Sequence, residues 1–195
     1  DQVIWDTLFF LFGGKSYAIF ALLFGFSFYI QNDNQEKIGN DFRLRFLWRL
    51  VLLLGFGVIN TIFYEGDILM IYAVLGVVLI PVSRWSNKAV FITATILMLQ
   101  PLQWMKSFYM LWNPEFIPGP NASNTYFELM GEYLKGNSFV DHAVGNLKTG
   151  RLASVLWSWE NGRFFQAPAL FMFGMLMGRK NLFAASAESN LFWKK

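Results

Sequence analysis

The sequence lacks cysteine, contains a single histidine and carries few charges. Only 15% of its 195 residues are charged, whereas an average soluble domain has about 25%. The chain therefore has too little charge to cover a surface that faces water. Without cysteine there is neither a disulfide framework nor a thiolate metal site, and one histidine cannot build a zinc site of the usual kind. We expect no metal and no cofactor.

Neither positive nor negative charge is in large excess. The 16 basic and 13 acidic residues give a net charge of +3, and the basic residues do not cluster on one face, which argues against nucleic-acid binding. Hydrophobic residues make up 55% of the chain and aromatic residues 19%, which argues against disorder. These values indicate a membrane protein. Because the chain begins at Asp1 and shows no signal peptide, we expect it to be a fragment.

Apolar runs of suitable length predict membrane spans. A helix crosses about 30 Å of hydrocarbon with about 20 residues and needs at least about 17. The predicted spans cover residues 15–31, 46–64, 68–82, 89–105 and 164–178. We therefore predict an all-α fold, a polytopic transmembrane bundle of about five spans.

The segment between the fourth and fifth spans differs in composition. Residues 106–162 contain prolines, asparagines and serines that mark turns. Within this segment, apolar residues from Tyr126 to Leu134 recur at helical spacing. We predict an N-terminal membrane part (1–105), an external segment with a surface helix (106–162), and a last part (163–195) that holds the fifth span and a cytoplasmic tail.

Basic residues of the short loops predict the orientation, because such loops stay in the cytoplasm. The loop 65–67 after the second span has no lysine or arginine. The basic residues follow the odd-numbered spans: Lys37, Arg43, Arg45 and Arg49 after the first, Arg84 and Lys88 after the third, and Arg179 and Lys180 after the fifth. These three regions therefore share the cytoplasmic side of the membrane.

Asp67 is the most informative acidic residue. As a helix cap it would accept backbone amide protons at the start of the third span. As a functional group it would be a base or a cation site at the membrane edge. Both roles are compatible, and the tight hairpin places Asn60 and Tyr64 of the second span beside it, with Glu65 nearby. A polar pocket of these residues is possible, although Asn60 could also serve helix packing alone.

Three further motifs favour structural interpretations. Gly14, Lys15 and Ser16 resemble the end of a P-loop, but Phe9 stands where the motif needs glycine. Asp141 and His142 are adjacent but lack an accompanying nucleophile motif. Gly174 and Gly178 form a G-x-x-x-G pair that allows two helices to approach closely.

Several strings occur together in this sequence: Gly14-Lys15-Ser16-Tyr17 with Leu22-Leu23-Phe24-Gly25, Arg49-Leu50 with Gly55 or Gly57, Glu65-Gly66-Asp67-Ile68-Leu69 with Tyr72-Ala73 and Gly76, Tyr133 to Ser138, and Phe173 to Arg179. In these strings the chain resembles the YeiB-type family of bacterial inner-membrane proteins, a domain of unknown function. The family is distantly similar to membrane acyltransferases, which implies acyl transfer from a cytoplasmic donor to an external acceptor. Asn60 stands where the family commonly has histidine, and Trp48-Arg49 where it has paired arginines.

Two functions remain open. In the first, the protein is an acyltransferase in which Asp67, Asn60 and Tyr64 are catalytic, while Lys15, Arg45, Arg49 and Tyr72 bind substrate. In the second, it is a non-catalytic transporter component or an assembly partner whose segment 106–162 docks another protein. Membrane lipid and other membrane subunits are the expected partners in both cases.

Overall fold

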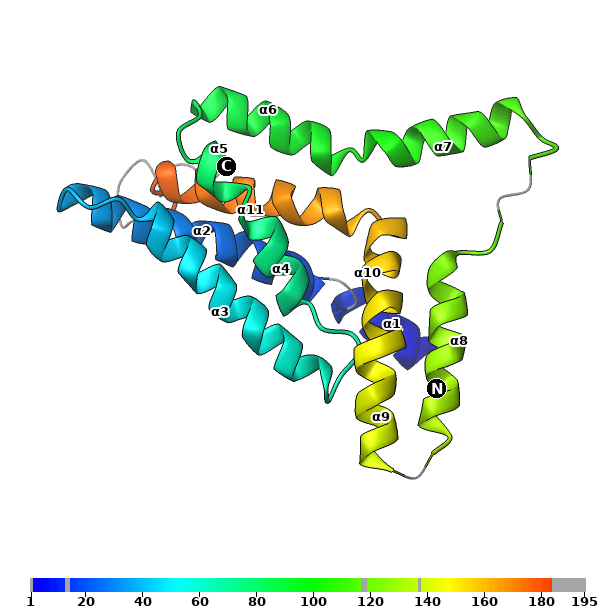
Figure 1. Ribbon diagram of the computed structural model, residues 1–195. Helices are drawn as coiled ribbons and strands as arrows, with labels where there is room; N and C mark the ends of the chain where they lie inside the picture. Colours follow the sequence, from blue (N-terminus) through cyan, green and yellow to red (C-terminus); the bar gives the residue numbers. More distant parts are fainter. Residues whose placement is uncertain (1, 13–14, 117–118, 137, 184–195) are drawn as a thin grey trace. The chain divides into compact units, whose positions relative to one another are not determined.

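The structure is a computed structural model that describes residues 2–12, 15–116, 119–136 and 138–183. Its regular elements are all helices, and none of these residues lies in a strand (Figure 1). The predicted all-α class is therefore confirmed. Of the motif residues named above, Gly14 and Asn137 lie outside the described residues, as do residues 184–195 of the predicted tail.

The chain divides into two compact units. Unit 1 comprises residues 1–44, 78–98 and 167–195, and unit 2 comprises residues 45–77 and 99–166. Each unit thus combines stretches that are distant in the sequence.

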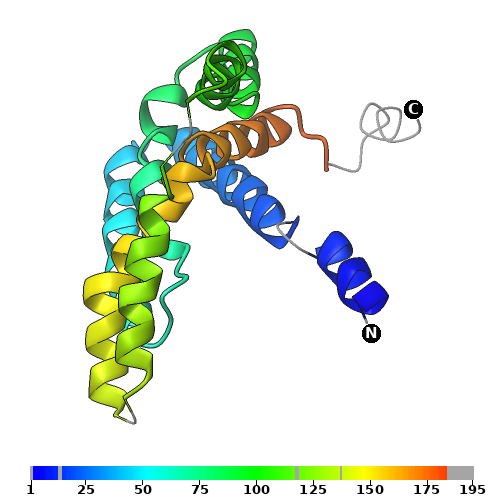
Figure 2. The same cartoon turned by 90° about the vertical axis from the view of Figure 1, so that its right-hand side faces the viewer.

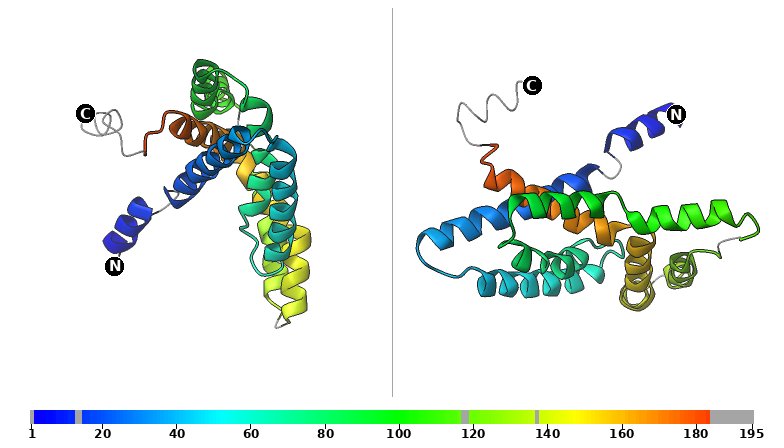
Figure 3. Two further views of the ribbon diagram at one scale, coloured as in Figure 1. Left: turned by 90° about the vertical axis from the view of Figure 1, so that its left-hand side faces the viewer. Right: turned by 90° about the horizontal axis from the view of Figure 1, so that it is seen from above.

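Unit 1 is built on a close crossing of α2 (Lys15–Lys37) and α11 (Arg163–Arg179) (Figure 3). A Cβ atom added at Gly25 would lie 1.8 Å from the carbonyl oxygen of Phe171, and one added at Gly174 would lie 1.9 Å from that of Leu22. Only glycine permits such contact between backbones. The close approach predicted from the G-x-x-x-G pair is confirmed, and Gly25 is the matching residue on α2.

Three short helices complete the described part of unit 1. They are α1 (Gln2–Phe12), α5 (Leu79–Val82) and α6 (Asn87–Met98). The core is apolar, with Phe28, Leu79, Val90 and Phe171 almost fully buried.

Unit 2 contains a helical hairpin. One arm is α8 (Ala122–Leu134), which includes the predicted surface helix. The other arm follows without a break as α9 (Phe139–Gly145), the π-helical turn η1 (Asn146–Gly150) and α10 (Arg151–Glu160). Figures 1 and 2 show the two arms side by side. Tyr133 of α8 lies against Gly145, where an added Cβ would be 2.6 Å from the Cβ of Tyr133.

The remaining elements of unit 2 are α3 (Arg43–Thr61), α4 (Leu69–Gly76) and α7 (Pro101–Trp112). Glu160 joins two parts of this unit, because its carboxylate accepts hydrogen bonds from the amide and the hydroxyl of Ser123 in the first turn of α8. Its backbone carbonyl accepts a third bond from Gln103 of α7, at 2.9 Å. An acid at a helix N-terminus also favours the helix dipole.

Two expected helices are divided in the structure. The run 89–105 breaks at Gln100, whose φ of 51° is left-handed, and Pro101 begins α7 instead of ending α6. Proline favours the first helical position, where its missing N–H has no partner to lose. The predicted boundary at 105/106 therefore falls inside α7. The run 68–82 is divided into α4 and α5, because Pro81 has no N–H to donate to the Val77 carbonyl.

Among the described residues, one helix is long and apolar enough to cross a membrane. It is α3, with 19 residues and a mean hydropathy of 1.5 over its most apolar window. A single helix of this kind is weak support for membrane insertion. The expected runs at 15–31 and 164–178 are helical, as α2 and α11, but five membrane spans stay a prediction.

Candidate functional site

Asp67 lies at the start of α4 and is largely buried, with 8% of its surface exposed. One carboxylate oxygen, Oδ1, accepts hydrogen bonds from the Asn60 side-chain amide at 3.0 Å and from the Leu69 backbone amide at 3.2 Å. The other oxygen, Oδ2, accepts from the Met70 backbone amide at 3.3 Å. The predicted helix cap and the predicted neighbour Asn60 are both confirmed. The cap acts from the residue before the N-cap, Ile68.

Gly57 makes room for this arrangement from the last turns of α3. A Cβ atom at this position would lie 2.9 Å from Oδ2 of Asp67 and 2.9 Å from the backbone nitrogen of Met70. Thr61, one turn later, is buried and donates its hydroxyl to the Gly57 carbonyl at 2.8 Å. The end of α3 and the start of α4 therefore pack closely enough for Asn60 to reach Asp67.

Two side chains from η1 and α10 hold the connecting loop on its other side. Asn146 donates its side-chain amide to the Ile62 carbonyl at 3.4 Å, and Ser154 donates its hydroxyl to the Glu65 carbonyl at 2.5 Å. Neither residue could be predicted from the sequence, because 84 and 89 positions separate them from their partners and no local pattern indicates such a pair. The loop 62–67 is therefore fixed from both sides.

The π-helical turn contains one unusual polar group, the buried side chain of Asn146. Asn146 has only 4% of its surface exposed, and its side-chain oxygen has no hydrogen-bond partner in the described part of the chain. Single π-helical turns occur often at functional sites. A Cβ atom added at Gly150 would lie 2.9 Å from the Cβ of Glu65. The π-helical turn therefore lies against the same loop.

The Tyr64 side chain makes no hydrogen bond to the cluster among the described residues, although the Tyr64 backbone amide donates to the Asn60 carbonyl at 3.0 Å. Its side chain is 57% exposed, and its ring lies against Gly66, where an added Cβ would be 2.6 Å from the Tyr64 hydroxyl oxygen. The structure thus brings Asn60 and Asp67 together and turns Tyr64 outward. The cluster consisting of Asn60, Asp67 and Gly57 is called the hairpin cluster below.

The predicted substrate-binding residues are spread out. Arg45 and Arg49 are exposed near the start of α3. Arg49 precedes Asn60 by eleven positions, which is about 16 Å along a helix at 1.5 Å per residue. Tyr72 is buried in α4, and Lys15 is exposed at the start of α2 in unit 1. The two arginines therefore cannot contact the same small group as Asp67.

Two basic residues of the predicted basic loop form ion pairs with acidic neighbours. Lys37 pairs with Asp33 at 2.6 Å, and the Arg43 guanidinium pairs with Asp41. Hydrogen bonds from the side chain and backbone of Arg43 hold the pKa of the Asp41 carboxyl well below its usual range. This pairing reduces the positive charge that the loop can offer to an anionic donor.

The His142 side chain makes a local contact with the backbone just before its own helix. Its Nε2 lies 2.9 Å from the Gly136 carbonyl oxygen, six positions earlier, which agrees with the structural interpretation of the Asp141–His142 pair. No group of three or more histidine, cysteine, aspartate or glutamate side chains in the described ranges is placed to hold a metal ion.

Two curated bacterial proteins resemble part of this chain. The "Uncharacterized 39.9 kDa protein in amylase 3'region" of Bacillus acidopullulyticus is 31% identical over 99 residues, which make up 51% of this chain and 29% of that protein. The "Uncharacterized protein YxaH" of Bacillus subtilis (strain 168) is 32% identical over 113 residues, 57% of this chain and 25% of that protein. The chain therefore spans less than a third of either relative. No family model matches the chain, and no solved structure matches it.

Proposed function

We propose that this chain is part of a multi-pass protein of the bacterial inner membrane, with about five spans, and that it belongs to the YeiB-type family it resembles. The observation that carries the membrane proposal is the surface of α3. Trp48, Leu52, Phe56 and Ile59 recur on one face of this helix and are exposed, Trp48 by 63% and Phe56 by 64%. A helix on the surface of a soluble protein would carry polar residues there.

The opposite face of α3 is also apolar or small. Phe46, Leu50 and Gly57 recur at helical spacing and are buried. After Arg49, α3 is apolar or small on both faces up to Ile59, and its exposed face requires an apolar surrounding. Lipid supplies that surrounding.

Other helices present the same kind of outer surface. The exposed apolar residues of α2 and α6 include Ile19, Phe20, Leu23, Phe91, Ile92 and Ile96. Every described residue of α7 is at least partly exposed, including Trp104, Phe108 and Trp112. These surfaces support several membrane-embedded helices.

The membrane proposal is tested by fractionation of cells that express the full-length protein. We expect the protein in the membrane pellet after alkaline carbonate washing, and in solution only after detergent is added. Release of the protein by carbonate alone would overturn the proposal. A known peripheral membrane protein serves as the control for the wash.

For the hairpin cluster, we propose a structural role first. Three donors converge on the carboxylate of Asp67, and they tie the end of α3 to the start of α4. A fixed hairpin suits a transporter component or an assembly partner as well as an enzyme.

Acyl transfer is the second candidate function, and the acceptor capacity left at Oδ2 of Asp67 favours it. An ionised carboxylate offers about four lone-pair sites, and Oδ2 accepts only the Met70 amide within the described part of the chain. In this function Asp67 takes the proton of an acceptor hydroxyl while the hydroxyl oxygen attacks the acyl carbonyl. The bond to the donor then breaks, and the donor leaves with the electron pair.

The two roles predict different results for Asp67→Asn in a strain that lacks the natural gene. Acyl transfer predicts that an acylated product lost on gene deletion returns with the natural protein but not with the variant, at equal protein levels. A structural role alone predicts that any loss follows the amount of folded protein. Mass spectrometry of cell-envelope lipids and glycans, with immunoblotting of the protein, measures both.

A further inference from the structure

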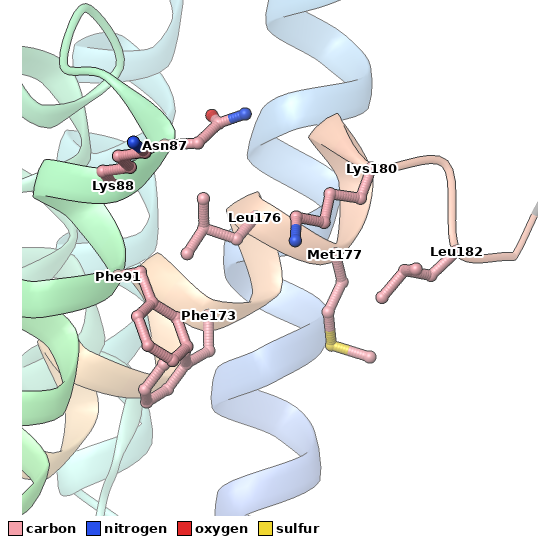
Figure 4. A pocket seen from close by; sticks show the side chains of 8 residues that line it. All are labelled: Asn87, Lys88, Phe91, Phe173, Leu176, Met177, Lys180 and Leu182. Carbon is pink, nitrogen blue, oxygen red and sulfur yellow. The ribbon is translucent and has the colours of Figure 1, made fainter. Parts of the chain in front are cut away.

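A cavity of about 630 Å³ lies within unit 1 beside α6 and α11. Its volume falls in the range of ligand sites, about 300 to 1,000 Å³. Five apolar side chains line most of it: Phe91, Phe173, Leu176, Met177 and Leu182 (Figure 4). Phe91 and Phe173 meet edge to face, with their ring centroids 5.9 Å apart.

The rest of the lining is polar and carries only positive charge. It consists of Asn87, Lys88 and Lys180. Lys88 is in the first turn of α6, and Lys180 directly follows the last residue of α11. No carboxylate pairs with either lysine in the described ranges. The polar residues therefore lie at helix ends, whereas Phe91 and Phe173 lie further along the helices.

Arg179 determines what Asn87 offers to this cavity. The guanidinium donates a hydrogen bond to the side-chain oxygen of Asn87 at 3.0 Å, and further bonds to the backbone carbonyls of Trp85, at 2.8 Å, and Ser83. The oxygen of Asn87 is thus engaged, and its amide nitrogen remains as a donor. The polar end of the cavity accordingly offers two ammonium groups and an amide, which suits an anion.

We propose that this cavity binds an anionic phospholipid of the surrounding bilayer. The phosphate lies between Lys88 and Lys180 and accepts a hydrogen bond from Asn87, and an acyl chain runs along Phe91, Phe173 and Met177. Charged groups at the helix ends and apolar groups along the helices match the order of headgroup and tail in a membrane leaflet.

The surface beside the cavity favours a lipid over a soluble anion. Phe91 lines the cavity and is itself exposed, and Ile92 and Ile96 continue the exposed apolar surface along α6. An acyl chain can therefore enter from the side without leaving an apolar surrounding. This inference rests on the proposed membrane location.

Native mass spectrometry of the full-length protein in detergent, titrated with phosphatidylglycerol, tests the proposal. We expect saturable binding that the double variant Lys88→Gln with Lys180→Gln weakens by about tenfold or more. The control Lys106→Gln with Lys135→Gln makes the same change in net charge on exposed lysines outside the cavity lining, and it should bind as the natural protein does. Equal binding by all three proteins, or equal loss in both double variants, would overturn the proposal.

Two further arms identify the ligand and its source. Phosphatidylethanolamine, which has no net charge, should bind more weakly than phosphatidylglycerol and respond less to loss of the two lysines. Inorganic phosphate should not displace phosphatidylglycerol, and Met177→Gln should weaken the lipid without changing the elution profile of the folded protein. Complete displacement by phosphate would mean that the site takes a soluble anion, which overturns the lipid proposal.

Failure of this inference is distinguishable from failure of the proposed function. A protein that resists carbonate washing but shows no lysine-dependent lipid binding contradicts only the lipid site. A protein that carbonate releases contradicts the membrane location itself.

Discussion

At the scale of single residues, the hairpin cluster depends on an absent side chain as much as on the polar groups. Gly57 faces Asp67 and the first turn of α4, whereas a Cβ atom at Gly55 on the same helix would meet nothing within 4 Å. The two glycines therefore form a matched pair for experiment. They share a helix and a residue type and differ in what they face.

Gly57→Ala should destabilise the protein, because the new methyl group would lie 2.9 Å from the Met70 backbone nitrogen. Backbone cannot yield as a flexible side chain can, so we expect a cost of about 1 to 3 kcal/mol, typical of overpacking. Gly55→Ala should leave stability unchanged or slightly higher, because alanine favours a helix over glycine. Thermal unfolding in detergent measures both variants. An equal effect of the two substitutions would contradict the packing of α3 against α4.

Asp67→Asn should cost more than the sequence alone suggests. A simple helix cap would keep most of its bond on this change, at a loss of no more than about 1 kcal/mol. The structure shows donors on both oxygens, and asparagine has one oxygen and one donating NH₂ group. At least one amide then faces another donor, for an expected loss of about 1 to 3 kcal/mol.

The exchange of both residues checks this explanation. In the double variant Asp67→Asn with Asn60→Asp, a carboxylate and an amide again face each other, so stability should exceed the sum expected from the two single variants. Thermal unfolding of all four proteins gives the coupling energy. Strict additivity would show that Asn60 and Asp67 do not interact.

The difference between what could and could not be predicted at this scale is one of sequence distance. Asn60 and Asp67 are seven positions apart, so the length of the hairpin alone places them side by side. Asn146 and Ser154 act on the same loop from more than eighty positions away, and only the folded unit brings them there. The separation of Arg49 from Asn60 could have been predicted from the helix rise of about 1.5 Å per residue, but the acyltransferase hypothesis assigns both residues to one site.

At the scale of elements, the crossing of α2 and α11 explains why both helices carry glycine. The pair Gly174 and Gly178 indicated a close approach, but the partner helix could not be identified because its glycine, Gly25, lies far away in the sequence. Helix ends were less predictable. Pro101 continues an apolar run in the sequence, yet its missing N–H makes it a better first residue than a last one.

Gly174→Ala should weaken unit 1 strongly. The added Cβ would lie 1.9 Å from the Leu22 carbonyl oxygen and 3.0 Å from the Phe26 backbone nitrogen, so α2 and α11 would have to separate. We expect a loss of at least about 1 to 3 kcal/mol. Gly131→Ala in α8 is the control, because nothing lies within 4 Å of its added Cβ. A melting temperature for Gly174→Ala equal to that of the control would contradict the crossing.

At the scale of the whole molecule, the proposed membrane arrangement assigns each loop to one side of the bilayer. In this proposed arrangement the short basic loops face the cytoplasm and segment 106–162 faces outward, because the short loops that carry lysine or arginine follow only the odd-numbered runs. The absence of cysteine from this chain suits it to labelling of single introduced cysteines. Asn34 and Asn124 are both exposed, and they lie in regions assigned to opposite sides.

A membrane-impermeant thiol reagent applied to intact cells should label Asn124→Cys and spare Asn34→Cys in the full-length protein. Disruption of the membrane should then make both sites react, which shows that lack of access, and not lack of reactivity, protected Asn34→Cys. The protein without an introduced cysteine gives the background. Lysine and arginine near membrane helices resist transfer across the bilayer, so the basic residues around Asn34 should hold this loop inside. Labelling of Asn34→Cys in intact cells, with Asn124→Cys protected, would reverse the orientation, and equal labelling of both sites would place both segments on the outer side.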